Sequence, residues 1–280
     1  MFQLILEMFT YPFMVRALCM GVLVALCSAL LGVTLVLKRY SMIGDGLSHV
    51  GFGSLAVATA MNVAPLAVAV PVVIAAAFLL LRLTENSKIK GDAAVALIST
   101  GALAVGVMVV SMTTGMNTDV YNYLFGSILS MSHGDVVLTG TVSAVILVLF
   151  VFFYNRIFAV TFDETFARAT GLNVQLYNSV IAVLTALIIV VGMRMMGSLL
   201  ISSLVVFPAV TSMRTCLTFR SVMICSAVVS TVCLTAGLVI SYLCAAPTGA
   251  SIVLCNIAAF ILFAAVQKGR ECLQSSKKSL

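Results

Sequence analysis

Asp45 and His49 are the two side chains in this sequence whose types and spacing best suit chemistry. They stand four residues apart in the stretch GDGLSHVGFG, and on an α-helix that spacing places both on one face, one turn apart. A carboxylate oxygen together with an imidazole nitrogen suits first-row divalent ions such as zinc, manganese or iron. The same spacing also fits an Asp–His hydrogen bond that only caps the helix, so the pair by itself leaves both interpretations open.

The composition places this pair in a membrane protein. Of 280 residues, 62% are hydrophobic and 9% are charged, and the mean hydropathy is +1.21. An average soluble chain is about 25% charged, so these values exclude a water-exposed fold. They also exclude disorder, which requires low hydrophobicity. We interpret the basic residues behind the net charge of +6 as topology markers and expect no nucleic-acid partner.

Apolar segments long enough to cross a bilayer, about 20 residues each, recur along the chain. The alternation typical of transmembrane β-strands is absent from the sequence. We therefore predict an all-α polytopic transmembrane helical bundle, one domain over residues 1–280 with about eight or nine spans. The expected spans are residues 14–37, 45–61, 64–82, 92–113, 135–155, 176–193, 197–213, 220–244 and 249–267. The second and seventh are short and marked by glycine, which leaves open whether they cross completely.

The positions of Lys and Arg predict the orientation. With the N-terminus outside and the C-terminus in the cytoplasm, Arg16 and Arg194 are the two basic residues left outside, as the positive-inside rule requires. The interior residues are Lys38, Arg39, Arg82, Lys88, Lys90, Arg156, Arg168, Arg214, Arg220, Lys268, Arg270, Lys277 and Lys278. A secretory signal peptide begins with a positively charged region. Here no basic residue precedes the first apolar run and the acidic Glu7 does, so we do not expect a cleaved signal peptide.

Asp45 lies at the start of the second expected span. A carboxylate at mid-bilayer costs about 2.5–3.5 kcal/mol on insertion scales, so it needs a partner or a function. The flanking glycines Gly44, Gly46, Gly51 and Gly53 would let another backbone approach closely.

The seventh expected span is interrupted. Met193 and Arg194 stand near its outer boundary, and Gly197 and Pro208 then break the apolar pattern. Such breaks are tolerated where the freed backbone groups are satisfied by protein or face a water-filled cavity, so this segment is a candidate wall of a pathway. Thioether sulfur prefers Cu(I), which favours packing for the methionine. We keep Met193 and Arg194 as weaker pathway candidates.

Three more candidates, Asp119, His133 and Asp135, belong to the segment expected outside. They fit an ordinary interfacial turn. The alternative, which the negative charge of the segment also fits, is a surface that captures an incoming cation.

A charged segment over residues 162–174 is expected inside. Asp163 and Glu164 would occupy the first turn of a short helix, Arg168 a later position and Gly171 its end, in agreement with dipole and capping preferences. The segment is either an interfacial loop or a docking element for a partner.

Several functional classes have no recognisable motif in the sequence. It has neither a Walker phosphate loop nor an HExxH pair. Its eight cysteines show no CxxC spacing, which argues against a disulfide framework or a zinc knuckle. No nucleophile–base pair is readable, so we do not expect an enzyme.

The segment DETFARATGLNV, which contains Asp163, Glu164, Ala167, Arg168 and Gly171, resembles the segment with which membrane subunits of ATP-binding-cassette (ABC) importers contact their ATPase. It is most similar to the zinc, manganese and iron importer permeases. Four other stretches resemble the same family in order: LKRYSMIGDGLSHVGFGSLAVA, TDVYNYLFGSIL, MGSLLISSLVVFPAVTSMR and CAAPTGASIVLCNIAAFILF. The resemblance covers residues 14–267. His133 departs from it, because the family pattern has a small polar residue there.

The resemblance implies a type II ABC importer-like permease of the bacterial inner membrane. It would work in the lipid bilayer as a homodimer or with a sibling permease, on a cytoplasmic ABC ATPase dimer that hydrolyses the ATP. An extracytoplasmic metal-binding protein would deliver a divalent metal, which is the substrate and not a permanently bound cofactor. Asp45 and His49 would be transient metal ligands, and residues 163–174 the mechanical contact.

Two alternatives stay open. The first is a permease for an iron–siderophore, haem or corrinoid, although a chain of 280 residues with an Asp–His pair argues against it. The second is a metal channel or carrier that works without an ATPase. The identity of the metal is not determined by the sequence.

Overall fold

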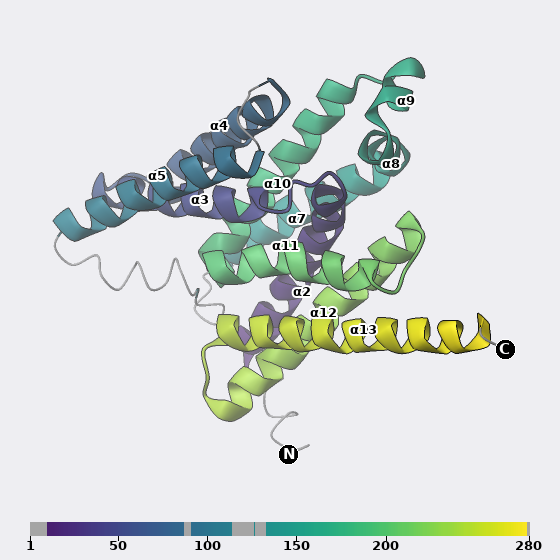
Figure 1. The fold of residues 1–280 in the computed structure, drawn as a ribbon. Coiled ribbons are helices and arrows are strands. Elements are labelled where there is room, and N and C mark those ends of the chain that lie inside the picture. Colours follow the sequence, from purple (N-terminus) through teal and green to yellow (C-terminus); the bar gives the residue numbers. More distant parts are fainter. Residues whose placement is uncertain (1–9, 87–90, 114–125, 127–132, 279–280) are drawn as a thin grey trace.

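The computed structural model describes residues 10–86, 91–113, 126 and 133–278, and every regular element within these ranges is a helix (Figure 1). The helices are α2 (Pro12–Leu37), α3 (Ile43–Ala60), α4 (Pro65–Asn86), α5 (Gly91–Met112), α7 (His133–Phe152), α8 (Tyr154–Phe162), α9 (Glu164–Ala169), α10 (Val174–Met196), α11 (Ser198–Met213), α12 (Phe219–Cys244) and α13 (Thr248–Lys278). The all-α prediction is confirmed for this part of the chain.

Each of the nine expected spans corresponds to one helix. Among the described residues, seven helices are long and apolar enough to cross a membrane: α2, α4, α5, α7, α10, α12 and α13. The remaining two, α3 and α11, are the second and seventh expected spans, so the sequence separated the short spans correctly.

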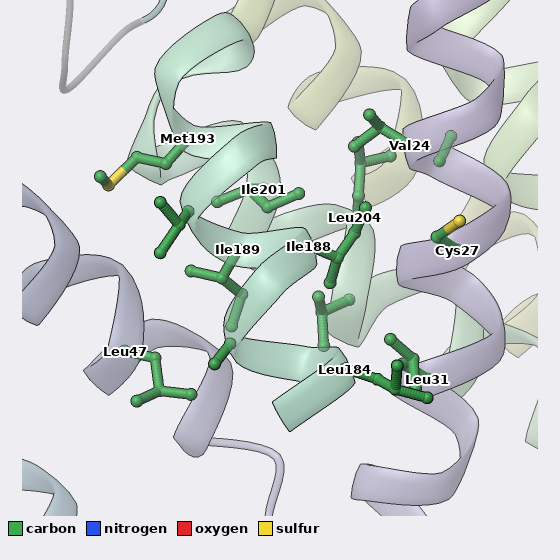
Figure 2. Close-up of a cluster of buried hydrophobic side chains, with 14 of the residues drawn as sticks. Val24, Cys27, Leu31, Leu47, Leu184, Ile188, Ile189, Met193, Ile201 and Leu204 are labelled. Atoms are coloured by element: carbon green, nitrogen blue, oxygen red, sulfur yellow. The ribbon is translucent and has the colours of Figure 1, made fainter. Parts of the chain in front are cut away.

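The core lies where α2, α10 and α11 meet. Within their apolar windows, 61% of the α2 residues and 67% of the α10 residues are buried, against 22% in both α7 and α13, so α2 and α10 are central and α7 and α13 peripheral. Aliphatic side chains from α2, α3, α10 and α11 interdigitate in this core (Figure 2). The labelled residues are Val24, Cys27, Leu31, Leu47, Leu184, Ile188, Ile189, Met193, Ile201 and Leu204.

Two glycines allow helices to approach at backbone distance. A Cβ atom added at Gly32 of α2 would lie 1.9 Å from the carbonyl oxygen of Val205 on α11, and one added at Gly53 of α3 would lie 2.5 Å from that of Ala102 on α5. The close approach expected at Gly53 is therefore present. Small residues serve this purpose in membrane bundles, where van der Waals packing drives helix association.

Hydroxyl groups add interhelical hydrogen bonds inside the bundle. Ser226 and Ser230 on α12 donate to the carbonyl oxygens of Ala29 and Ala25 on α2, at 3.4 and 3.1 Å. The serines satisfy their own polar groups while they fix α12 along α2. Because these hydrogen bonds fix α12 against α2, the longer helices that surround α3 and α11 have defined positions.

We expect Gly32→Ala to lower the thermal unfolding midpoint of the purified protein by several degrees. The added methyl group has no space beside Val205, and overpacking a tight core costs about 1–3 kcal/mol. Gly101→Ala on α5 is the control, because a Cβ atom there meets nothing within 4 Å. Equal midpoints for the two variants in thermal melts would contradict this account of the α2–α11 contact.

Candidate functional site

The Asp45–His49 pair lies in the first two turns of α3. Nε2 of His49 is 3.6 Å from Oδ2 of Asp45, so both side chains share one face of the helix. The Asp45 carboxylate also sits at the N-terminal end of the helix, where the helix dipole favours negative charge. The side chains are 47% and 26% exposed on the surface of the single chain. The pair therefore presents an oxygen and a nitrogen to a ligand from outside the helix.

Ser202 joins this pair from the interrupted helix α11. Its hydroxyl lies 3.3 Å from that of Ser48, which itself donates to the carbonyl oxygen of Asp45 at 2.7 Å. The Ser202 hydroxyl itself donates to the carbonyl oxygen of Ser198 at 2.9 Å. Ser202 was not among the candidate residues, because nothing in its local sequence indicates that it meets α3.

One nitrogen of the pair has no protein partner. Within the described residues, Nδ1 of His49 is buried and makes no hydrogen bond. Buried polar atoms are normally paired, so an orphaned imidazole nitrogen indicates a ligand or a functional demand. In the same part of the chain, no group of three or more His, Cys, Asp and Glu side chains could hold a metal. Two ligands are fewer than the three or four of resident zinc sites, so an ion bound here would complete its shell with other groups.

The weaker candidates at the other end of α10 have separate environments. Arg194, in the last turn of α10, forms an ion pair with Asp135 of α7 at 3.1 Å. Met193 is fully buried, and its methyl group packs at the position of Gly51, so the structure places it in the core. His133 begins α7 and is exposed. Asp119 lies outside the described residues.

Gly126 contacts the junction between α10 and α11. Its φ of +73° is in the left-handed region, and an added Cβ atom would lie 2.1 Å from the carbonyl carbon of Met196. Both features favour glycine. The resemblance in TDVYNYLFGSIL included this residue without indicating its contact.

The charged segment contains a short helix with a defined start and end. Oδ1 of Asp163 caps α9 by accepting from the backbone N–H groups of Thr165 and Phe166, both at 2.9 Å. Gly171 has φ +82°, and Leu172 N–H donates to the Ala167 carbonyl at 3.0 Å, which ends the helix in a Schellman motif. The stop expected at Gly171 and the position of Glu164 in the first turn are confirmed, whereas Asp163 is the N-cap and lies just before the helix, which is limited to Glu164–Ala169.

The residues of this segment face in different directions. Ala167 is fully buried and packs with Val160, Val174 and Tyr177. Arg168 is exposed, and Phe166 beside it is 62% exposed. Ala167 therefore holds α9 on the bundle, whereas Arg168 and Phe166 form its outward surface. Phe166 was not among the candidates, although an aromatic residue in a charged stretch is a signal for an interface.

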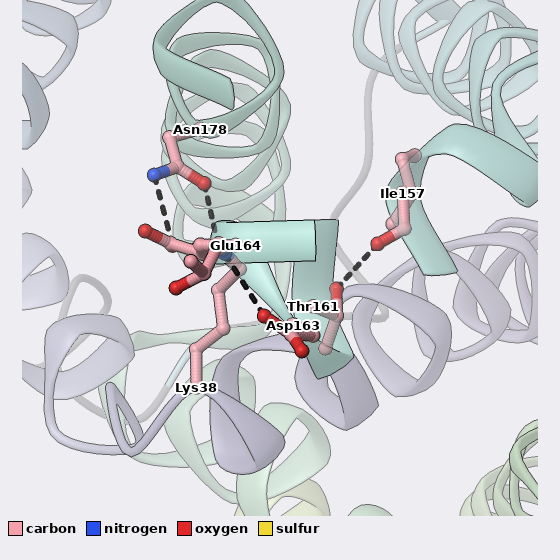
Figure 3. Close-up of polar contacts among 7 residues, drawn as sticks. Lys38, Ile157, Thr161, Asp163, Glu164 and Asn178 are labelled. Carbon is pink, nitrogen blue, oxygen red and sulfur yellow. Dashed lines mark hydrogen bonds and ion pairs between the residues drawn. The ribbon is translucent and has the colours of Figure 1, made fainter. Parts of the chain in front are cut away.

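Glu164 faces inward, toward α2 and α10 (Figure 3). Its Oε1 lies 2.8 Å from Nζ of Lys38 and accepts from Nδ2 of Asn178 at 3.2 Å. Partial burial alone would raise the pKa of Glu164, but the hydrogen bond and charge of Lys38, with Asn178 and Arg168, hold this pKa below its usual range. From the sequence, Lys38 was predicted only to mark the inner side of the membrane, because its contact with Glu164 joins residues far apart in the chain.

The two ion pairs mark opposite ends of the bundle. Asn178, near the start of α10, lies with Lys38 and Glu164, whereas Arg194, at the end of α10, lies with Asp135. This grouping agrees with the expectation that Lys38 and Glu164 lie on one side of the membrane and Asp135 and Arg194 on the other. Which end faces the cytoplasm stays a prediction from the positive-inside rule.

Comparison with known proteins gives one consistent family. The ABC 3 transport family matches residues 10–267. The chain is 28% identical over 246 residues to the high-affinity zinc uptake system membrane protein ZnuB of Haemophilus influenzae, covering 88% of this chain and 94% of that protein. It is 31% identical over 278 residues to a probable iron transport system membrane protein of the same organism, covering 96% and 99%. Among solved structures, PsaBC from Streptococcus pneumoniae in complex with Fab matches with a TM-score of 0.83 at 28% identity, covering 93% of this chain and 94% of that chain.

We expect Asp163→Ala to destabilise α9 locally without unfolding the bundle. Loss of an N-cap costs about 1 kcal/mol, so amide exchange at Thr165 and Phe166 should become about fivefold faster. Hydrogen–deuterium exchange with mass spectrometry measures this. Asp163→Asn keeps the capping oxygen and should exchange like the wild type. Equal exchange in all three proteins would show that the cap does not stabilise α9.

Proposed function

The chain belongs to the ABC 3 transport family, and from this premise we propose that it is the membrane-spanning subunit of an ATP-driven importer of a divalent transition metal, namely zinc, manganese or iron. The observation that carries the proposal is the Asp45–His49 pair, whose Oδ2 and Nε2 atoms lie 3.6 Å apart on a partly exposed face of α3. The names of the zinc and iron relatives support the choice of cargo. ATP is hydrolysed on a partner chain in this proposal.

Asp45 and His49 serve as transient ligands of the passing ion. The hard carboxylate oxygen and the borderline imidazole nitrogen accept all three metals. Their exposed sides point away from the bundle of one chain, so water or a second permease copy supplies the remaining ligands. Because this chain supplies only part of the metal's coordination shell, the metal ion is released readily after it binds. Ser202 of α11 adds a hydroxyl group next to Ser48, on the same part of α3.

The outward surface of α9 is the contact for the cytoplasmic ABC ATPase. Arg168 and Phe166 combine a cation with an aromatic ring, and both residue types are enriched in protein interfaces. An extracytoplasmic metal-binding protein would dock at the opposite end of the bundle, near His133 and the Asp135–Arg194 pair. The permease pairs with itself or with a sibling copy.

The bilayer covers the apolar outer faces of the peripheral helices. Val148 and Val151 of α7 are 67% and 70% exposed, and Leu254 and Ile261 of α13 are 65% and 62% exposed. Such faces are stable in lipid, where apolar side chains carry no penalty. This supports a multi-pass membrane protein. In the proposed function it lies in the bacterial inner membrane, with the N-terminus outside and the C-terminus in the cytoplasm as the positive-inside rule predicts.

Asp45→Asn and His49→Gln should each lower ATP-dependent metal uptake by about tenfold or more, since even groups that only orient a metal ligand contribute about 10–100-fold in affinity. Uptake of zinc, manganese and iron is measured in vesicles that contain the permease, its ATPase and its binding protein. Asp92→Asn, an exposed carboxylate in the first turn of α5, is the control. Wild-type uptake by both pair variants would refute the assigned ligands.

Arg168→Glu should reduce co-purification of the ATPase severalfold, because reversing a charge at an interface places like charges together. The control is Arg270→Glu, which reverses an exposed cation on α13. Pull-down yields of the ATPase, compared at equal permease amounts, check the prediction. If both variants retain the ATPase equally, α9 is not the contact.

A further inference from the structure

Lys38 connects three helices through its ammonium group (Figure 3). It pairs with Glu164 of α9 at 2.8 Å and donates to Oδ1 of Asn178 on α10, while Asn178 donates to Glu164 at 3.2 Å. The three side chains form a closed triangle. The Lys38 side chain is 6% exposed and that of Glu164 is 42% exposed, so water reaches the pair from the Glu164 side while the Lys38 charge depends mainly on these partners.

The backbone around Lys38 forms a fixed turn between α2 and α3. Lys38 is the C-cap of α2, and Arg39 follows with a φ of +62°, a conformation that is sterically disfavoured outside glycine. Tyr40 N–H donates to the Leu35 carbonyl at 2.8 Å, which closes the turn, and α3 begins at Ile43. Because the turn is short and hydrogen-bonded, a displacement of Lys38 displaces the first turn of α3.

That first turn contains Asp45, with His49 one turn later. A helix moves as a rigid element over such a distance, so the two proposed ligands follow the turn. A small cavity of about 20 Å³, roughly the size of one water, lies between this turn and helices α4 and α10. Lys38, Tyr40 and Ile43 line one side of it and Ala77, Leu81 and Ile181 the other. The turn therefore has room for a small shift.

We propose that the Lys38–Glu164 ion pair transmits movement of α9 to Asp45 and His49, which makes Lys38 a positioning residue for metal transport. The inference rests on the proposed function, in which α9 receives the movement of the ATPase. Lys38 follows Glu164 because its largely buried ammonium would lose a charge-assisted hydrogen bond if the two side chains separated. Asn178 adds α10, which ends at the junction with α11, the helix of Ser202.

The test uses the complete complex in vesicles, supplied in turn with zinc, manganese and iron, and measures metal ions transported per ATP hydrolysed. Glu164→Gln and Lys38→Met remove one charge each. We expect both complexes to assemble and hydrolyse ATP while transport per ATP falls by roughly fivefold or more, the lower end of typical allosteric coupling factors. The double variant Lys38→Glu with Glu164→Lys exchanges the two charges and should recover most of the wild-type ratio of metal ions transported per ATP. Lys268→Met and Glu271→Gln, which alter exposed charges on α13, are matched controls.

An unchanged transport ratio in both single variants overturns the inference. A loss of assembled complex that fully accounts for the lost transport also overturns it, because that result means a purely structural pair. If Lys38→Met does not assemble, Glu164→Gln, which keeps a hydrogen-bonding side chain in place, decides the matter. Wild-type vesicles that accumulate none of the three metals would instead refute the proposed function, and the inference with it.

Discussion

A bilayer interior offers no water to a polar group, and this constraint shapes the whole structure. Backbone groups are satisfied within helices, and hydroxyl side chains follow the same rule. Thr185 donates to the carbonyl oxygen of Ile181 and Ser54 to that of Gly51, each within its own helix. The described ion pairs Lys38–Glu164 and Asp135–Arg194 lie near helix ends. The Asp45–His49 pair also lies near a helix end, but it is an exception in another respect, because both members stand on one helix that is otherwise rich in small apolar residues.

The short helices α3 and α11 make that exception possible. Both are framed by longer helices, and glycine lets them pack at backbone distance, Gly53 of α3 against α5 and Gly32 of α2 against α11. The frame fixes α3 without covering the face that carries Asp45. Ser202 from α11 reaches the same face. Tight packing on one side of α3 and polar access on the other suit the proposed role of this helix as a site for a passing ion.

The segment around α9 likewise divides different roles among its residues. Its caps at Asp163 and Gly171 make α9 a defined helix, and Ala167 seats it on a small apolar cluster. Arg168 and Phe166 are exposed and form the proposed docking surface, while Glu164 contacts Lys38 of the bundle. A six-residue helix thus has an outer face for docking and an inner charge that joins it to α2 and α10.

The sequence by itself determined the features that depend on near neighbours along the chain. Hydrophobic length placed the spans, capping residues marked the limits of α9, and the four-residue spacing put Asp45 and His49 on one face, because helix periodicity and capping are local properties. Only the tertiary structure decided the partners. Lys38 meets Glu164 across 126 residues of sequence, and Ser48 meets Ser202 across 154. Such contacts depend on how helices distant in sequence pack against one another, and no local pattern records that arrangement.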